Sequence, residues 1–122
     1  MIKTWKDDTF KNDFVYCISE TAENIYGHIK KHKHKMDITL DRLKELCANA
    51  SGFCICKDSV FYLIIVKPRS GTIAHECFHI TYHSLSSIDT PLTDDTEEIY
   101  AYYLDKHVQN VFGMWIKLEE PS

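Results

Sequence analysis

The residues best suited to chemistry form one short segment, His75-Glu76-Cys77-Phe78-His79. Its two histidines stand four positions apart, so on an α-helix both rings lie on one face, about 6 Å apart along the axis. Two imidazoles at that spacing can bind one zinc ion through bonds of about 2.0–2.1 Å. Glu76 follows the first histidine, where its carboxylate can reach a metal-bound water without ligating the metal. Because zinc lowers the pKa of bound water to about 7, Glu76 could accept its proton.

The positions around this HExxH motif favour a functional site over a chance match. At about 100° per residue, the polar side chains of the helix gather within about a quarter turn. They are Thr72, His75, Glu76, His79, His83 and Ser86, and apolar side chains occupy the rest of the circumference. We therefore expect the motif to lie along the polar strip of an otherwise buried helix.

A catalytic zinc usually has three protein ligands and one open position. His83 is one candidate, but it stands eight residues after His75, about 12 Å along a helix and beyond the reach of one ion; we expect it to line the cleft. The others are Glu97 and Glu98 of the last predicted helix, whose apolar stripe would consist of Tyr100, Ala101, Leu104, Val108, Val111 and Phe112. Glu97 falls near the middle of that stripe, where a carboxylate needs a strong partner such as a metal, and Glu98 falls at its edge. The pattern leaves both open.

His75-Glu76-x-x-His79 followed by Glu98-x-x-Ala101 resembles the gluzincin metallopeptidases, above all the very small gluzincin-like proteins of phages and mobile elements. The resemblance covers about residues 50–112. It implies a minimal zincin domain in which Glu98 is the third zinc ligand and Glu97 a reserve ligand or neighbour. The ImmA-type peptidases of mobile elements are similar in the same motifs, but this chain lacks their continuation after Ala101.

Two roles of a peptidase site have no motif here. Gluzincins often have an Asp four residues after the ligand Glu to orient a zinc-bound imidazole, and this chain has Tyr102 at that position; Tyr102 or Asp105 could orient the ring instead. A peptidase also needs a donor for the oxyanion of the tetrahedral intermediate. The candidates are Tyr102, Tyr103, His83 and His107.

The elements that must position these residues follow a mixed pattern, which predicts an α+β fold with a small sheet, the motif helix and a C-terminal ligand helix. We expect a strand over 14–18, a helix from 20 to about 32 capped by Ser19, and a second helix capped by Asp37. A hairpin of residues 53–56 and 60–67 precedes the motif helix, which runs from about 70 to 85. The last helix would begin after Thr93 or Asp94 and end at Gly113.

Length and composition limit the classes of protein to which this chain could belong. The chain has 122 residues, which suits one domain over residues 1–122. Its net charge of −4 argues weakly against general nucleic-acid binding. No apolar run spans a bilayer and the first residues contain no apolar signal segment, so we expect a cytoplasmic location. The five cysteines form no CxxC pair, which argues against a disulfide framework.

Two further groups have simpler interpretations than a site. His28 to Lys35 could contact phosphates or bind metal through His28 and His32, but a solvated helix end is the plainer interpretation. Cys54 and Cys56 should face one side of a strand and, with Cys47 nearby, could hold metal, although packed thiols are commoner. Cys77 should point to the apolar side of its helix and be inert.

The sequence therefore predicts a zinc-dependent hydrolase, first of all a metallopeptidase that cleaves a peptide or protein substrate. Zn²⁺ would be held by His75, His79 and Glu98, with Glu76 as general base. The alternative is a catalytically silent zinc-binding interaction module of a phage or mobile element. We expect no membrane partner and regard a nucleic-acid partner as the weakest alternative; substrate and oligomeric state have no signal in the sequence.

Overall fold

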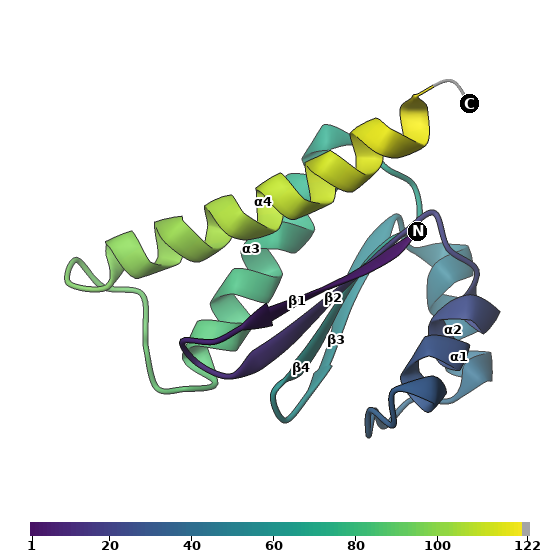
Figure 1. The fold of residues 1–122 in the computed structure, drawn as a ribbon, viewed down its shortest axis with the longest axis horizontal. Helices are drawn as coiled ribbons and strands as arrows, with labels where there is room; N and C mark the ends of the chain where they lie inside the picture. Colours follow the sequence, from purple (N-terminus) through teal and green to yellow (C-terminus); the bar gives the residue numbers. More distant parts are fainter. Residues whose placement is uncertain (121–122) are drawn as a thin grey trace.

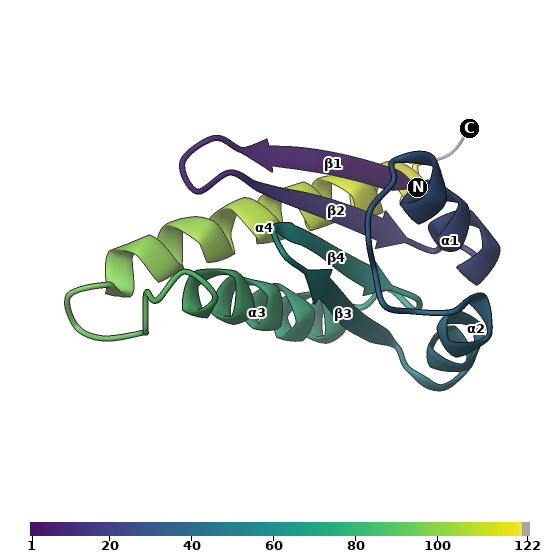
Figure 2. The same ribbon diagram turned by 90° about the horizontal axis from the view of Figure 1, so that it is seen from below.

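The computed structural model describes residues 1–120 and is built from a four-stranded sheet and helices on both of its faces (Figures 1 and 2). The elements are β1 (Ile2–Asp7), β2 (Asn12–Ile18), α1 (Ala22–Lys31), α2 (Leu40–Asn49), β3 (Gly52–Lys57), β4 (Val60–Ile65), α3 (Ser70–Ser86) and α4 (Glu97–Glu119). The strand order is β1-β2-β4-β3, with β2 and β4 parallel and the two outer pairs antiparallel. The predicted α+β class is confirmed.

The central strands are buried on both faces, because successive side chains of a strand point to opposite sides. Phe14, Tyr16 and Ile18 of β2 belong to one hydrophobic cluster with α3 and α4. The intervening Val15 and Cys17 belong to a second cluster with α1 and α2. The α3–α4 layer and the α1–α2 layer therefore cover opposite faces of the sheet (Figure 1).

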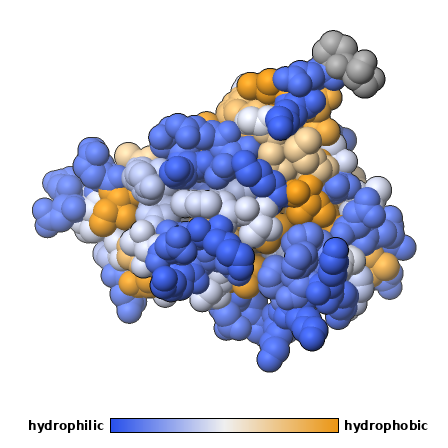
Figure 3. Space-filling model, in the orientation of Figure 1, coloured by the Kyte–Doolittle hydropathy of each residue, from blue (hydrophilic) through white to orange (hydrophobic). Residues whose placement is uncertain are grey.

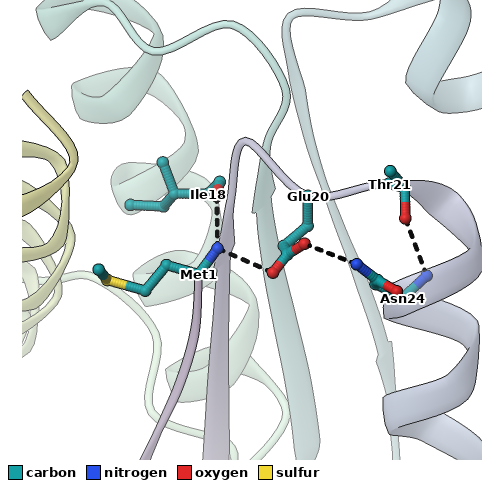
Figure 4. A network of polar contacts seen from close by, with 5 residues as sticks. All are labelled: Met1, Ile18, Glu20, Thr21 and Asn24. Carbon is teal, nitrogen blue, oxygen red and sulfur yellow. Dashed lines mark hydrogen bonds and ion pairs between the residues drawn. The ribbon is translucent and has the colours of Figure 1, made fainter.

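Strand β1 was not predicted, because Ile2–Asp7 carries polar residues on both faces and has no apolar run. It forms because its backbone pairs with β2 along its whole length. Figure 4 shows how the beginning of this strand is held: the Met1 amine donates to the Ile18 carbonyl oxygen (3.0 Å) and to the Glu20 carboxylate (2.8 Å). Glu20 also accepts from the Asn24 side chain at 3.1 Å, which ties the edge strand to the first turn of α1.

The first two predicted helices exist, but both predicted caps were wrong. Thr21, not Ser19, caps α1, and its hydroxyl accepts from the backbone N–H of Asn24 at 3.1 Å. Thr39, not Asp37, caps α2 in the same way. In each case a hydroxyl accepts from the third helical N–H, one of the donors that lack a partner inside the helix.

Helix α4 differs most from its prediction. It begins after Thr96 and passes through Gly113 to Glu119, since Met114 and Trp115 beyond that glycine pack on the core cluster. Its buried residues are Tyr100, Tyr103, His107, Val111 and Met114, so the apolar stripe is rotated by roughly 80° from the predicted one, counted at about 100° per residue. Beyond the core, Ile116 and Leu118 in its last turns are exposed. Figure 3 shows apolar surface close to the C-terminal end of the chain. No helix within residues 1–120 is long and apolar enough to cross a membrane.

Candidate metal centre

Helix α3 carries the HExxH motif, and its buried face fixes the direction of the motif residues. Ile73, Cys77 and Ile80 are at most 1% exposed and pack in the cluster between the sheet and α4. Their spacing of four and three residues makes one continuous helix face. His75 lies on the other side of the helix and is exposed, while His79 is half-buried. The predicted polar strip is thus present, but the expectation that the rest of the helix is buried was wrong, because Phe78 and Tyr82 are 47% and 43% exposed.

The two motif imidazoles lie close together at the surface. The Nε2 atoms of His75 and His79 are 3.1 Å apart, and their ring centroids are 4.6 Å apart with an interplanar angle of 71°. Two nitrogens bound at about 2.1 Å to a tetrahedral zinc ion are about 3.4 Å apart. The separation of the two nitrogens is therefore within a few tenths of an ångström of the separation that zinc requires.

Glu76 points into the space between α3 and β3. Its residue is 8% exposed, in contrast to the exposed His75 beside it. The Cys54 thiol of β3 lies 3.7 Å from both the carboxylate Oε1 and the backbone oxygen of Glu76. Burial, followed by the Glu76 charge, raises the pKa of the Cys54 thiol, so Cys54 remains protonated and is a hydrogen-bond donor to Glu76.

Gly52 makes this close approach possible. A Cβ atom at position 52 would lie 3.0 Å from Cγ of Glu76, 3.0 Å from Cγ2 of Thr72 and 3.2 Å from the Ile64 carbonyl oxygen. Those separations are tighter than ordinary contacts, so glycine lets the start of β3 pass beside the Glu76 side chain. No local pattern in the sequence indicates this neighbour, because Glu76 lies on a different element further along the chain.

A cleft runs between the edge strand β3 and helix α3, the two elements that lie side by side in Figure 2. It consists of two adjoining hollows of about 330 and 560 Å³ that share Gly52, His75 and Glu76. His79 and His83 line the smaller one, and the His83 ring stacks near His79 with centroids 6.0 Å apart. The motif residues thus face one open cleft, and His83 lines it as expected.

The predicted carboxylate ligands lie elsewhere. Glu97 and Glu98 occupy the first turn of α4, where both are exposed. Two residues further on, Tyr100 packs with Leu85 at the end of α3. Because Leu85 is six residues beyond His79 and ten beyond His75, this contact lies about 9 Å and about 15 Å along the helix axis from the two imidazoles. Accordingly, within residues 1–120 no three His, Cys, Asp or Glu side chains are grouped to hold a metal ion.

The proposed oxyanion donors are divided between surface and core. Tyr103 is buried and its hydroxyl donates to the Asp7 carboxylate at 2.9 and 3.0 Å. His107 is fully buried among aromatic rings, with Nδ1 2.8 Å from the Tyr16 hydroxyl. Tyr102 is 55% exposed on α4, and none of these residues lines the two hollows of the cleft.

Asp105, the other predicted orienting group, is exposed on α4 and accepts from the Gln109 side chain at 3.3 Å. Of all the candidates for these supporting roles, only His83 lies in the cleft. The contact of the Cys54 thiol with Glu76 was not predicted. The only sequence feature that pointed to Cys54 was its alternation with Cys56 along a strand.

The cysteine group of the sequence is split by the sheet. Cys54 and Cys56 both line the cleft, as their alternation predicts. Cys47 packs in the α1–α2 layer on the opposite face, so the suggestion that it joins them was wrong. Cys77 is fully buried, and burial raises its pKa to about 12, so it is an unreactive core thiol.

No protein-family model matches the chain, and no curated protein or solved structure matches it significantly. The assignment of function therefore rests on the geometry of the cleft between β3 and α3.

Proposed function

We propose that this chain is a zinc-dependent hydrolase that cleaves peptide bonds, built on a minimal zincin-type domain. The observation that carries the proposal is the pair of Nε2 atoms of His75 and His79, 3.1 Å apart, with the Glu76 carboxylate lining the same cleft. This order and spacing is that of a zinc-binding pair with an adjacent general base. When bound, zinc would act as a Lewis acid that lowers the pKa of a water molecule and polarises the substrate carbonyl.

Each motif residue then has one task. His75 and His79 would hold the ion, and their four-residue spacing on one helix keeps the pair together. Glu76 accepts a proton at its carboxylate from the attacking water and returns it to the leaving amine. The Cys54 thiol and the space left by Gly52 hold that carboxylate toward the cleft. His83 lines the cleft beside His79 and can donate to a developing oxyanion.

The third protein ligand remains Glu98 in this proposal, with Glu97 in reserve, on the strength of the Glu98-x-x-Ala101 motif. Since Tyr100 packs beside Leu85, ligation by Glu98 requires the first turn of α4 to move along α3 toward His79. Residues 87–96 between the two helices provide chain for that movement. Glu98→Gln should then weaken zinc binding, whereas Glu97→Gln should leave it unchanged; the opposite result would assign the ligand to Glu97.

The direct test replaces Glu76 with Gln and compares cleavage of a degenerate peptide library, with zinc content measured on the same samples. Loss of a general base should lower turnover by about 10²–10⁴-fold while zinc is retained. Glu45→Gln is the matched control, because Glu45 is an exposed carboxylate on α2, in the layer opposite the cleft. Undiminished cleavage by Glu76→Gln would reject the mechanism.

The position of Glu98 favours one competing function. If the first turn of α4 stays where it packs beside Leu85, the imidazole pair would bind zinc weakly and the protein would act as a zinc-binding interaction module. Such a module would bind zinc and cleave no member of the peptide library. Zinc uptake with cleavage that is lost in Glu76→Gln would exclude it.

A further inference from the structure

Three histidines form a second cluster on the face of the sheet opposite the cleft. His28 lies in the last turn of α1, His32 caps that helix and His34 follows it. Their ring centroids are 4.1 Å apart for His28 and His32, 5.8 Å for His32 and His34, and 6.2 Å for His28 and His34. All three imidazoles therefore lie within contact of one another.

The backbone fixes this arrangement. Lys33 adopts a left-handed conformation (φ 55°) directly after α1. The N–H of Lys33 donates to the Lys30 carbonyl (3.1 Å) and the N–H of His34 donates to the Ile29 carbonyl (3.0 Å). This pair of bonds is the Schellman pattern of a helix C-terminus. It turns the chain back so that His34 returns to the side of the helix that carries His28.

A buried tyrosine orients two of the rings. The Tyr62 hydroxyl of the central strand β4 lies 3.0 Å from Nδ1 of His28 and 2.6 Å from Nδ1 of His34. With both Nδ1 atoms engaged, the Nε2 atom of each ring is the one left for an external ligand. Partners of this kind commonly fix the tautomer and ring angle of metal-binding histidines.

We propose that His28, His32 and His34 form a second binding site for a divalent transition metal such as zinc, independent of the HExxH cleft. Three imidazoles on one tetrahedral zinc, with bonds of about 2.1 Å, have centroids about 5.2 Å apart, and the separations in the cluster lie within about 1 Å of that value. As they stand, the rings are too nearly parallel to converge on one point, in keeping with the absence of a ready three-ligand group within residues 1–120. His32 is exposed, so its ring has room to turn toward the other two.

The charge around the cluster affects its affinity for zinc. The surrounding chain, from Lys30 to Lys35, is rich in lysine and repels a cation. Because salt screens that repulsion, zinc binding here should strengthen as ionic strength rises, unlike binding by a cluster of carboxylates.

The test isolates the cluster by using full-length His75→Ala/His79→Ala protein and titrating it with zinc chloride in a calorimeter. We expect one equivalent to bind, and the further change His32→Ala/His34→Ala to abolish it. Tyr62→Phe should keep the stoichiometry but weaken binding by about 10–100-fold, the usual effect of losing an orienting partner. Lys31→Ala is the matched control from the same helix end, and it should retain the site and bind zinc somewhat more tightly.

Two results would overturn the proposal: no zinc binding by the His75→Ala/His79→Ala protein, or equal binding after His32 and His34 are removed. Circular dichroism of each variant checks the fold. The single variant His32→Ala, at an exposed position, is a second test of zinc binding in which the Tyr62 contacts to His28 and His34 stay in place. Failure of the peptidase proposal would leave this outcome unaffected, since the two sites lie on opposite faces of the sheet.

Discussion

Acid should destabilise this protein through His107, which was a candidate for catalysis in the sequence and is a core residue in the structure. The ring is fully buried, and it lies 4.5 Å from the Phe14 ring and 5.8 Å from the Trp5 ring, centroid to centroid. Its Nδ1 atom meets the Tyr16 hydroxyl, and its Nε2 atom has no partner within residues 1–120. Burial lowers the pKa of His107 from 6.5 to about 3.

The sign and size of the effect follow from linkage. The unfolded chain takes up a proton on His107 as the pH falls through 6.5, whereas the folded protein does not until about pH 3. Stability from this group is therefore complete above pH 6.5 and is lost progressively below it. At pH 5, about 1.5 pH units below the unfolded pKa, the loss is about 2 kcal/mol, because each unit corresponds to about 1.4 kcal/mol.

His107→Phe measures this contribution, since phenylalanine keeps a ring of similar shape and does not titrate. Tyr16 then loses a hydrogen bond but still meets the Asn110 amide at 3.4 Å, and that loss is the same at every pH. Urea unfolding at pH 7.5 and pH 5 should show a drop in the free energy of unfolding that is about 2 kcal/mol smaller in the variant than in the parent protein. His83→Phe, which removes an exposed imidazole, should behave like the parent. An equal drop in His107→Phe and the parent would refute the reasoning.

Three further predictions concern other positions. Gly52→Ala should push the Glu76 side chain by a few tenths of an ångström and lower peptide turnover while zinc content stays constant; equal turnover would show that the carboxylate has room to adjust. Tyr103→Phe removes a donor from the buried Asp7 carboxylate and should cost about 1–3 kcal/mol in urea unfolding, unless water replaces the hydroxyl. Gly113→Ala should stabilise α4 by about 0.5–1 kcal/mol, seen as a higher melting temperature, because a Cβ there meets no atom within 4 Å. A lower melting temperature for Gly113→Ala would show that the glycine is needed in the helix.

Local patterns in the sequence were enough to predict the motif helix and the hairpin. The motif helix follows from its polar strip and from Ile73, Cys77 and Ile80 on the buried side. The strands of the hairpin are short and mostly apolar, the second contains the β-branched residues Val60, Ile64 and Ile65, and the turn between them is polar. Such signals depend on neighbours within about one turn of helix or one strand, so they survive without knowledge of the fold.

Features that depend on distant partners were missed. Strand β1 has little apolar content and exists through its backbone pairing with β2. The end of α4 was predicted at Gly113 because glycine disfavours helix by about 1 kcal/mol, a penalty that the burial of Met114 and the packing of Trp115 outweigh. Because of the same packing, the side of α4 that faces the core differs from the predicted side. Tyr103 and His107 are therefore buried, and Ala101 is exposed.

The sequence by itself determined that two imidazoles stand on one face of one helix with a carboxylate at the next position, because a spacing of four residues fixes the geometry of the pair wherever the helix is placed. Only the tertiary structure decided what surrounds them. The sheet order makes β3 the edge strand beside the motif and brings Cys54 to Glu76, and the antiparallel packing of α4 on α3 carries Glu98 to the far end of the motif helix. Those neighbours result from the burial of apolar faces contributed by residues far apart in the chain, which local spacing does not encode.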